Sequence, residues 1–308
     1  MKLARVVSAS YIRPERNLPP KEAVEDNLAN ILKLLRAAAA EEPDVVCLPE
    51  AAPTRGLPPK DAVLVAEEIP GQVFEAVSSL AKEYSMYVVC PMIEKQGGLV
   101  YNSAVLIDRS GGLVGKYRKI HPTISEIESG ITPGREQRPL KTDFGKIGFA
   151  ICYDLNFEDV IKPLHAEDVK LVFFPTAYPG GLNLNAWALT YGTYIVSSRN
   201  GEGSAIVDPL GRTLVTSSAY STIIAKTVNL DYEILHLDYN YEKIEAMKRK
   251  YGARVEVDVV RPEAVFMLAS NAEDMAVPDL ISEFDLEKRD DYFARARDVR
   301  DKALATLG

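Results

Sequence analysis

The sequence of 308 residues is poor in cysteine and histidine, with three of each. The cysteines are Cys47, Cys90 and Cys152, and this odd, sparse count excludes a disulfide-stapled secreted scaffold and favours a reducing compartment. No stretch approaches the roughly 18 apolar residues of a membrane span, and the opening "MKLARVVSAS" lacks the apolar region of a signal peptide. We therefore expect a cytoplasmic protein that does not use a membrane as a partner.

The sequence also lacks an excess of positive charge. Its formal net charge is -8, whereas a nucleic-acid binder would show a basic stripe, so nucleic acid is not an expected partner. No histidine or cysteine cluster has metal-ligand spacing, and we expect neither a metal nor another cofactor. The hydrophobic share of 47% and the charged share of 26% are typical of a globular protein with a sizeable core.

Strands and helices alternate along the first 230 residues. Apolar residues recur at helical spacing in residues 21–43 and 71–84, whereas short apolar runs such as "DVVCLPE" and "KLVFFPT" are typical of strands covered on both faces. Turn residues 109–112 and 209–211 separate strand pairs and predict hairpins. The pattern predicts a mixed α/β architecture.

The composition changes at about Asp231. The segment "DYEILHLDYNYEKIEAMKRKYG" is rich in tyrosine and charge, and "DLEKRDDYFARARDVRDKALATLG" predicts a charged terminal helix. We interpret residues 1–230 as the main domain. Residues 231–308 are a C-terminal extension that packs on the same domain or on a partner subunit.

Three residues stand where predicted strands end. Glu50 follows the apolar run "VVCLP", Lys119 ends the segment "GKYRK", and Cys152 closes the run "GFAIC". Each could be an ordinary surface or core residue, although α/β sheets hold their sites at the carboxyl ends of strands. Together they supply a nucleophilic thiol, a carboxylate general base and a cation for a developing oxyanion. Cys47 and Cys90, within apolar runs, are expected to be inert core residues.

The segments "CLPE" around Glu50, "YRKIHP" around Lys119 and "ICYDLNFED" around Cys152 resemble, in order and separation, the three signature blocks of the nitrilase superfamily of carbon–nitrogen hydrolases. The resemblance covers about residues 3–230. It implies an αββα sandwich that pairs across a subunit interface, so we expect a homodimer or a higher homo-oligomer.

The resemblance also implies a second glutamate before a Pro-Gly pair, which holds the lysine and orients the substrate amide. The segment "SEIESGITPG" offers Glu126 and Glu128, and we prefer Glu128 because its distance to Pro133-Gly134 is nearer the family's. The main-chain N–H of Tyr153 is implied to complete an oxyanion hole with Lys119.

Further residues near the predicted nucleophile are candidates for substrate binding, and the first two are Tyr153 and Asp154, which directly follow it. Cys152-Tyr153-Asp154 resembles the amidase and carbamoylase branches, whereas true nitrilases tend to have Cys-Trp-Glu. The chain has Asn156 where many relatives have arginine, and it reads "ALTYGTYIVSSRN" where many have "RAxEN". The remaining candidates either line the pocket or pack in the core: Phe157, Tyr178 and Trp187.

The reaction that fits best is hydrolysis of a small-molecule, non-peptide amide through a cysteine thioester, with release of ammonia or an amine. Hydrolysis of an N-carbamoyl group or a nitrile by the same Glu-Lys-Cys set is the alternative. A papain-like protease would need a local cysteine-protease signature and a histidine partner, and the sequence lacks that signature. An inactive scaffold is a further possibility, against which the intact set of three residues argues.

Overall fold

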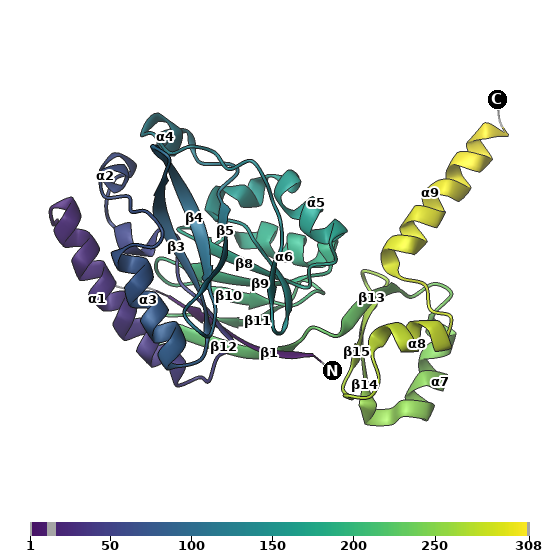
Figure 1. The fold of residues 1–308 in the computed structure, drawn as a ribbon. Helices are drawn as coiled ribbons and strands as arrows, with labels where there is room; N and C mark the ends of the chain where they lie inside the picture. Colours follow the sequence, from purple (N-terminus) through teal and green to yellow (C-terminus); the bar gives the residue numbers. More distant parts are fainter. Residues whose placement is uncertain (1, 11–16, 307–308) are drawn as a thin grey trace. The chain divides into compact units, whose positions relative to one another are not determined.

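A computed structural model describes residues 2–10 and 17–306 of the chain (Figure 1). Contacts divide the chain into two compact units, Ala4–Val228 and a C-terminal unit that begins at Asn229. This division lies beside residue 230, where the composition predicts the main domain to end. The surface on which the C-terminal unit packs stays a prediction.

The larger unit is built on two six-stranded sheets. In each sheet three neighbouring strands pair in parallel, and antiparallel hairpins extend the sheet from them. The first sheet, in spatial order, comprises β12 (Ile223–Asn229), β1 (Leu3–Ala9), β2 (Val45–Cys47), β3 (Tyr87–Gln96), β4 (Leu99–Ile107) and β5 (Leu113–Arg118). The second comprises β11 (Thr213–Thr216), β10 (Ala205–Val207), β9 (Tyr194–Arg199), β8 (Leu171–Thr176), β7 (Gly145–Phe149) and β6 (Leu140–Thr142).

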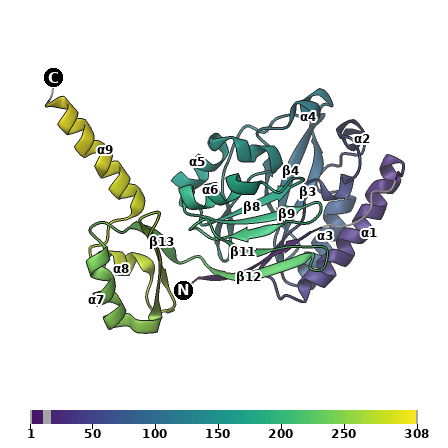
Figure 2. The same ribbon diagram turned by 180° about the vertical axis from the view of Figure 1, so that it is seen from behind.

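Helices cover the outer faces of the two sheets and give the predicted αββα sandwich (Figures 1 and 2). On the first sheet lie α1 (Pro20–Ala39) and α3 (Gln72–Glu83), and on the second lie α5 (Glu158–Ala166) and α6 (Gly181–Tyr191). Shorter helices are α2 (Pro59–Leu64), α4 (Ile124–Glu128), and the single 3₁₀ turns η1 (Ala52–Thr54) and η2 (Cys152–Asn156). The predicted helices and hairpins are confirmed, although α1 ends at Ala39, four residues before Pro43.

Small polar residues join the inner faces of the two sheets. Ser8 Oγ on β1 donates a hydrogen bond to the carbonyl of Ser197 at 2.7 Å, and Ser198 Oγ on β9 donates to the carbonyl of Ala9 at 3.0 Å. These serines are fully buried or nearly so. Because a serine is short and its hydroxyl is paired here, the strands approach closely without a buried polar group being left unsatisfied.

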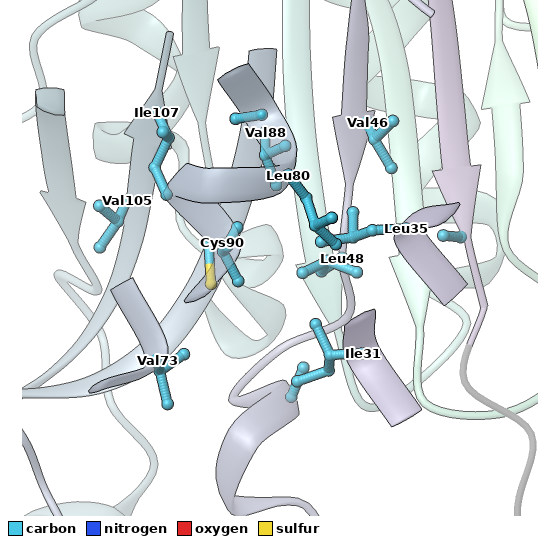
Figure 3. Close-up of a cluster of buried hydrophobic side chains, with 14 of the residues drawn as sticks. Ile31, Leu35, Val46, Leu48, Val73, Leu80, Val88, Cys90, Val105 and Ile107 are labelled. Atoms are coloured by element: carbon cyan, nitrogen blue, oxygen red, sulfur yellow. The ribbon is translucent and has the colours of Figure 1, made fainter. Parts of the chain in front are cut away.

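A large apolar core lies between the first sheet and its helices (Figure 3). Ile31 and Leu35 of α1 and Leu80 of α3 are almost fully buried, and they pack over Val46 and Val88 of the sheet. Burying each such side chain contributes roughly 1.5–3 kcal/mol. This layer fixes β2, the strand that leads to Glu50.

The C-terminal unit has a sheet of its own, in the antiparallel order β13-β15-β14. Leu235, Phe266 and Leu268 of this sheet form a separate core with Met247 and Leu280 from the helices. The predicted charged terminal helix is confirmed, whereas the sheet was not predicted. The elements are β13 (Tyr232–His236), α7 (Tyr241–Tyr251), η3 (Gly252–Arg254), β14 (Val255–Val260), β15 (Val265–Ser270), α8 (Val277–Glu283) and α9 (Arg289–Ala305).

Candidate active site

Glu50 follows β2, a buried strand that ends three residues earlier at Cys47. Its side chain is only 8% exposed. The Nδ2 of Asn200 donates a hydrogen bond to the main-chain carbonyl of Glu50 at 2.9 Å, and Asn200 follows β9 of the second sheet. A buried carboxylate requires a partner of opposite charge or a set of donors, because removing it from water is costly.

That partner is Lys119, the residue after β5. Its side chain is 1% exposed, and Nζ lies 2.9 Å from Glu50 Oε1 and 2.8 Å from Glu126 Oε2. The lysine backbone is fixed too, because its carbonyl accepts the N–H of Gly134 at 2.8 Å. A Cβ at position 134 would stand 2.1 Å from the carbonyl oxygen of Arg118, so only glycine allows this approach.

Cys152 lies where β7 gives way to the η2 turn. Its φ of 50° is in the left-handed region, which is uncommon outside glycine and is found at functional sites where the surroundings enforce it. The enforcing group is Asp154, which is fully buried and accepts the N–H of Ile151 at 2.8 Å and that of His121 at 2.9 Å. Tyr117 donates its hydroxyl to the same carboxylate at 2.8 Å. The strand-to-turn junction therefore holds the thiol at the edge of the sheet.

The glutamate beside Lys119 is Glu126, and the preference for Glu128 as that partner is wrong. Glu126 is 9% exposed, whereas Glu128 is exposed to solvent. The reason is helix phase: Thr123 and Glu126 form a capping box at the start of α4, which turns Glu126 toward the lysine. The sequence "TISE" carries this capping signal, and it would have favoured Glu126.

Sequence reasoning missed Asn102, in the middle of β4. Its Nδ2 donates to Glu50 Oε1 at 3.0 Å and to Glu126 Oε1 at 2.9 Å. The only signal was a polar residue inside the apolar run "LVYNSAVLI". Asn102 thus joins the two carboxylates that also share Lys119.

The protonation states follow from these contacts. Burial alone would lower the pKa of Lys119, but the charges of Glu50 and Glu126 outweigh it and raise that pKa. Burial works to raise the pKa of Glu126, but Lys119 and the hydrogen bonds from Thr123 and Asn102 outweigh it and lower that pKa. Lys119 is therefore a cation and Glu126 an anion at neutral pH.

The thiol of Cys152 is neutral in the resting site. Burial, and next the charge of Glu50, raise the pKa of Cys152 to about 12, against opposing effects of Lys119 and of the N–H of Ala177. Because the thiolate is the reactive nucleophile, Cys152 needs a base that takes its proton during attack. Glu50 makes a side-chain hydrogen bond with the thiol and is placed for this task.

A cavity of about 500 Å³ opens onto these groups. Its lining includes Glu50, Lys119, Glu126 and Cys152 together with Asn102 and Asn200. Apolar residues also line it, beside Thr54 and Arg55: Leu57, Pro58, Pro59, Ala62, Ile93 and Ile131. This mixed lining suits a small molecule that carries both a polar reacting group and an apolar part.

The predicted substrate-binding residues are not among those that line this cavity, so only the main-chain N–H of Tyr153, next to Cys152, remains a candidate for the site. Asp154 is the clearest correction, because it is wholly buried and holds the nucleophile loop instead of meeting a ligand. Phe157 stacks on His121 at 3.9 Å, and Tyr153 packs edge-on against Phe157.

Tyr178 and Trp187 lie outside the cavity lining as well. Tyr178 is nevertheless close enough to the nucleophile for the two groups to influence each other's ionisation: burial raises the pKa of its phenol to about 12, and an ionised Cys152 would contribute to that rise. Trp187 is 7% exposed and packs edge-on against Tyr191 of the same helix, which is the core-packing alternative.

Residues 2–10 and 17–306 contain no group of three or more histidine, cysteine, aspartate or glutamate side chains that could hold a metal ion. Within the same residues, no helix is both long enough and apolar enough to cross a membrane.

Comparison with known proteins identifies a hydrolase of carbon–nitrogen bonds. The carbon-nitrogen hydrolase family matches residues 13–234, and the chain belongs to this family, in the amidase-type branch of the nitrilase superfamily. The omega-amidase NIT2 of Mus musculus is 28% identical over 271 residues, which cover 77% of this chain and 94% of that protein.

Solved structures share the fold. One of them is Nit3 of Saccharomyces cerevisiae, a member of branch 10 of the nitrilase superfamily. It superposes with a TM-score of 0.65 at 19% identity, and the match covers 82% of this chain and 95% of the Nit3 chain. An amidase from Nesterenkonia sp. superposes with a TM-score of 0.65 at 18% identity, and the match covers 80% of this chain and 96% of the amidase chain.

Proposed function

We propose that this enzyme hydrolyses a small-molecule amide through a thioester on Cys152. The observation that carries the proposal is the buried cluster in which Lys119 bridges Glu50 and Glu126 beside Cys152. A carboxylate base, a fixed cation and a nucleophilic thiol that line one cavity are the parts that acyl transfer needs.

In the acylation step, Cys152 Sγ attacks the amide carbon while Glu50 accepts the thiol proton. The carbonyl oxygen becomes an oxyanion, which Lys119 and the main-chain N–H of Tyr153 stabilise. The carbon–nitrogen bond then breaks and Glu50 returns its proton to the leaving nitrogen. Ammonia or an amine departs, and the acyl group remains on sulfur.

In the deacylation step, Glu50 takes a proton from water as the water oxygen attacks the thioester. The tetrahedral intermediate collapses, the carbon–sulfur bond breaks, and the proton passes to Cys152. A carboxylic acid is released. Glu126 stays an anion throughout and holds Lys119 in place.

The test is ammonia release from aliphatic, aromatic and amino-acid amides, N-carbamoyl amino acids and nitriles, with Cys152→Ala measured in parallel. We expect turnover of amides that disappears in Cys152→Ala. Turnover of carbamoyl compounds alone would favour the alternative reaction, and full amide turnover by Cys152→Ala would contradict the nucleophile assignment.

We also propose that the enzyme is at least a homodimer, as the family resemblance implies. The measurement is mass by light scattering at micromolar concentration. A monomer mass would contradict this assembly.

A further inference from the structure

Asn102 contacts three members of the catalytic cluster at once. Its side chain is 2% exposed and donates to both Glu50 and Glu126, and its main-chain carbonyl accepts the N–H of Lys119 at 2.8 Å. It lies on β4, between β3 and the edge strand β5 that delivers the lysine. No other described residue outside the Glu-Lys-Cys set donates to both carboxylates.

Asn102 Nδ2 donates one hydrogen to each carboxylate, but the two carboxylates differ in how many of their oxygens accept hydrogen bonds. On Glu126, Oε1 accepts from Asn102, and Oε2 accepts from Lys119 Nζ at 2.8 Å and from the N–H of Thr123 at 2.7 Å, so both oxygens are occupied. On Glu50, Oε1 accepts from both Asn102 and Lys119, at 3.0 and 2.9 Å. An oxygen that accepts two such donors is a poor site for a proton.

The remaining oxygen of Glu50 is in a different position. Within the described part of the chain, Oε2 of Glu50 accepts no hydrogen bond from a cation, an amide or a main-chain N–H. The thiol of Cys152 is the neighbour that hydrogen-bonds to this carboxylate. We propose that Asn102 is a positioning residue that keeps Glu126 and the Oε1 atom of Glu50 as acceptors, so that Glu50 Oε2 is the atom that takes the thiol proton.

A purely structural role for Asn102 fits the geometry less well. Its Oδ1 is buried and has no hydrogen-bond partner among the described residues, which costs free energy. Leucine, of similar volume, would remove that unsatisfied oxygen, so packing alone would favour leucine at this position. The two donor hydrogens are what leucine would lack.

This inference rests on the proposed function, and its test includes a readout that needs no substrate. The first readout is the rate at which iodoacetamide alkylates Cys152 as a function of pH, followed by mass spectrometry. The second is the pH profile of kcat/KM on the fastest amide. The groups around the two carboxylates that titrate or carry charge are Lys119, Cys152, Asp154 and Tyr178.

The variants are Asn102→Leu and Asn102→Asp, with Asn200→Leu as the matched control. Asn200 also holds Glu50, but through the main-chain carbonyl, and among residues 2–10 and 17–306 it donates to no carboxylate. In Asn102→Leu each carboxylate loses a hydrogen bond that stabilises its charged form, so the pKa of Glu50 should rise. The acid limb of both profiles, meaning the pH range in which the rate falls on acidification, should therefore move up by about one pH unit. Asn102→Asp adds a like charge beside both carboxylates and should move the limb further.

Asn200→Leu can lower the rates, but it should leave the position of the acid limb unchanged. If both Asn102 variants lower the rates equally at every pH, the positioning role is wrong. Asn102→Asp is nearly isosteric, so it keeps the test valid should circular dichroism show that Asn102→Leu is unfolded.

The two proposals fail in distinguishable ways. A moved alkylation limb without turnover of any amide would overturn the proposed reaction and support the role of Asn102. Amide turnover with an unmoved acid limb in both Asn102 variants would support the proposed reaction and overturn the role of Asn102.

Discussion

Lys119 Nζ lies 2.8 Å from the Oε2 atom of Glu126, in a site where both side chains are almost wholly removed from water. Glu128, two residues further on, is exposed. Two glutamates within one short helix therefore have opposite environments. This contrast provides a matched pair for testing the site.

We predict that Glu126→Gln lowers kcat/KM by roughly 100-fold or more, the loss typical of removing one electrostatic contact in a preorganised site. Glutamine cannot balance the charge of Lys119, and its amide group places a donor toward another donor. Steady-state kinetics on the best amide measures the loss.

Glu128→Gln is the control, because it makes the same chemical change on the same helix. Its kcat/KM should stay within about twofold of the unmodified enzyme, since exposed substitutions away from the site have small effects. Equal losses in the two variants would show that α4 as a whole, and not Glu126, is responsible.

The second prediction concerns which thiol reacts. Burial raises the pKa of Cys90 to about 12, as burial and the charge of Glu50 do for Cys152, so at pH 7 either thiol is ionised to the order of only 10⁻⁵. Cys152 differs because it lines the cavity and has Glu50 as a base, whereas Cys47 and Cys90 are buried. Iodoacetamide should therefore add once to the native protein, at Cys152, and three times after denaturation.

The rate of this alkylation should depend only weakly on pH above neutrality. Because the pKa of Cys152 is raised to about 12, its thiolate does not accumulate between pH 7 and 10, and attack depends on proton transfer to Glu50. The rate should be nearly flat over that range. A tenfold rise per pH unit that levels off near pH 8.5 would mean that the thiol is an ordinary exposed one.

The three strand-end residues of the site could be predicted because each apolar run shows where its strand stops. The structure brings Glu50, Lys119 and Cys152 to one cavity, as their positions imply. The choice between Glu126 and Glu128 needed the phase of a five-residue helix, and the capping signal that sets this phase is a local one.

Other features could not be predicted because they depend on contacts between distant segments. Asn102 and Asp154 are polar residues with partners from distant segments, and although Asp154 also accepts the nearby N–H of Ile151, nothing in the sequence around either residue specifies the distant partners. The sheet of the C-terminal unit is a similar case, since Tyr232–His236 and Val265–Ser270 pair across more than twenty intervening residues. Local pattern gives strand propensity, but the pairing is decided by tertiary packing.

The third prediction tests the support of the nucleophile loop. Asp154→Asn should lower the free energy of unfolding by about 2–3 kcal/mol, because the amide nitrogen would face a donor from Ile151, His121 or Tyr117 and leave it unsatisfied. Tyr117→Phe removes one donor and leaves two, so about 1 kcal/mol is expected. Urea denaturation with an unchanged m value measures both.

The same variants should separate stability from activity. Asp154→Asn loosens the junction that holds Cys152 at positive φ, so kcat should fall even at temperatures where the variant is fully folded. Should Asp154→Asn be as stable and as active as the unmodified protein, the loop does not depend on this carboxylate.

The last prediction concerns Glu94, a carboxylate outside the catalytic cluster. It lies on β3 with its side chain 1% exposed and accepts from Ser103 at 2.6 Å and from Arg118 at 2.6 and 3.1 Å, with Lys116 as a further partner. Burial works to raise the pKa of Glu94, but the hydrogen bonds from Arg118, Lys116 and Ser103 outweigh it and lower the pKa. A carboxyl group whose pKa is lower in the folded state stabilises the fold above its unfolded pKa of about 4.3, and this contribution is lost as the pH falls through the folded value.

Glu94→Gln removes this titration, so the variant should be less stable at pH 7 yet lose less further stability on acidification than the unmodified protein. The measurement is the free energy of unfolding at pH 7 and at several values from 5 down to 3 for both proteins. Glu128→Gln again serves as the control, because its side chain is exposed to solvent and the stability of this variant should follow the unmodified protein. Parallel pH dependences for Glu94→Gln and the unmodified protein would show that the carboxylate of Glu94 does not contribute to acid sensitivity, because only a group that binds protons differently in the two states can change the slope.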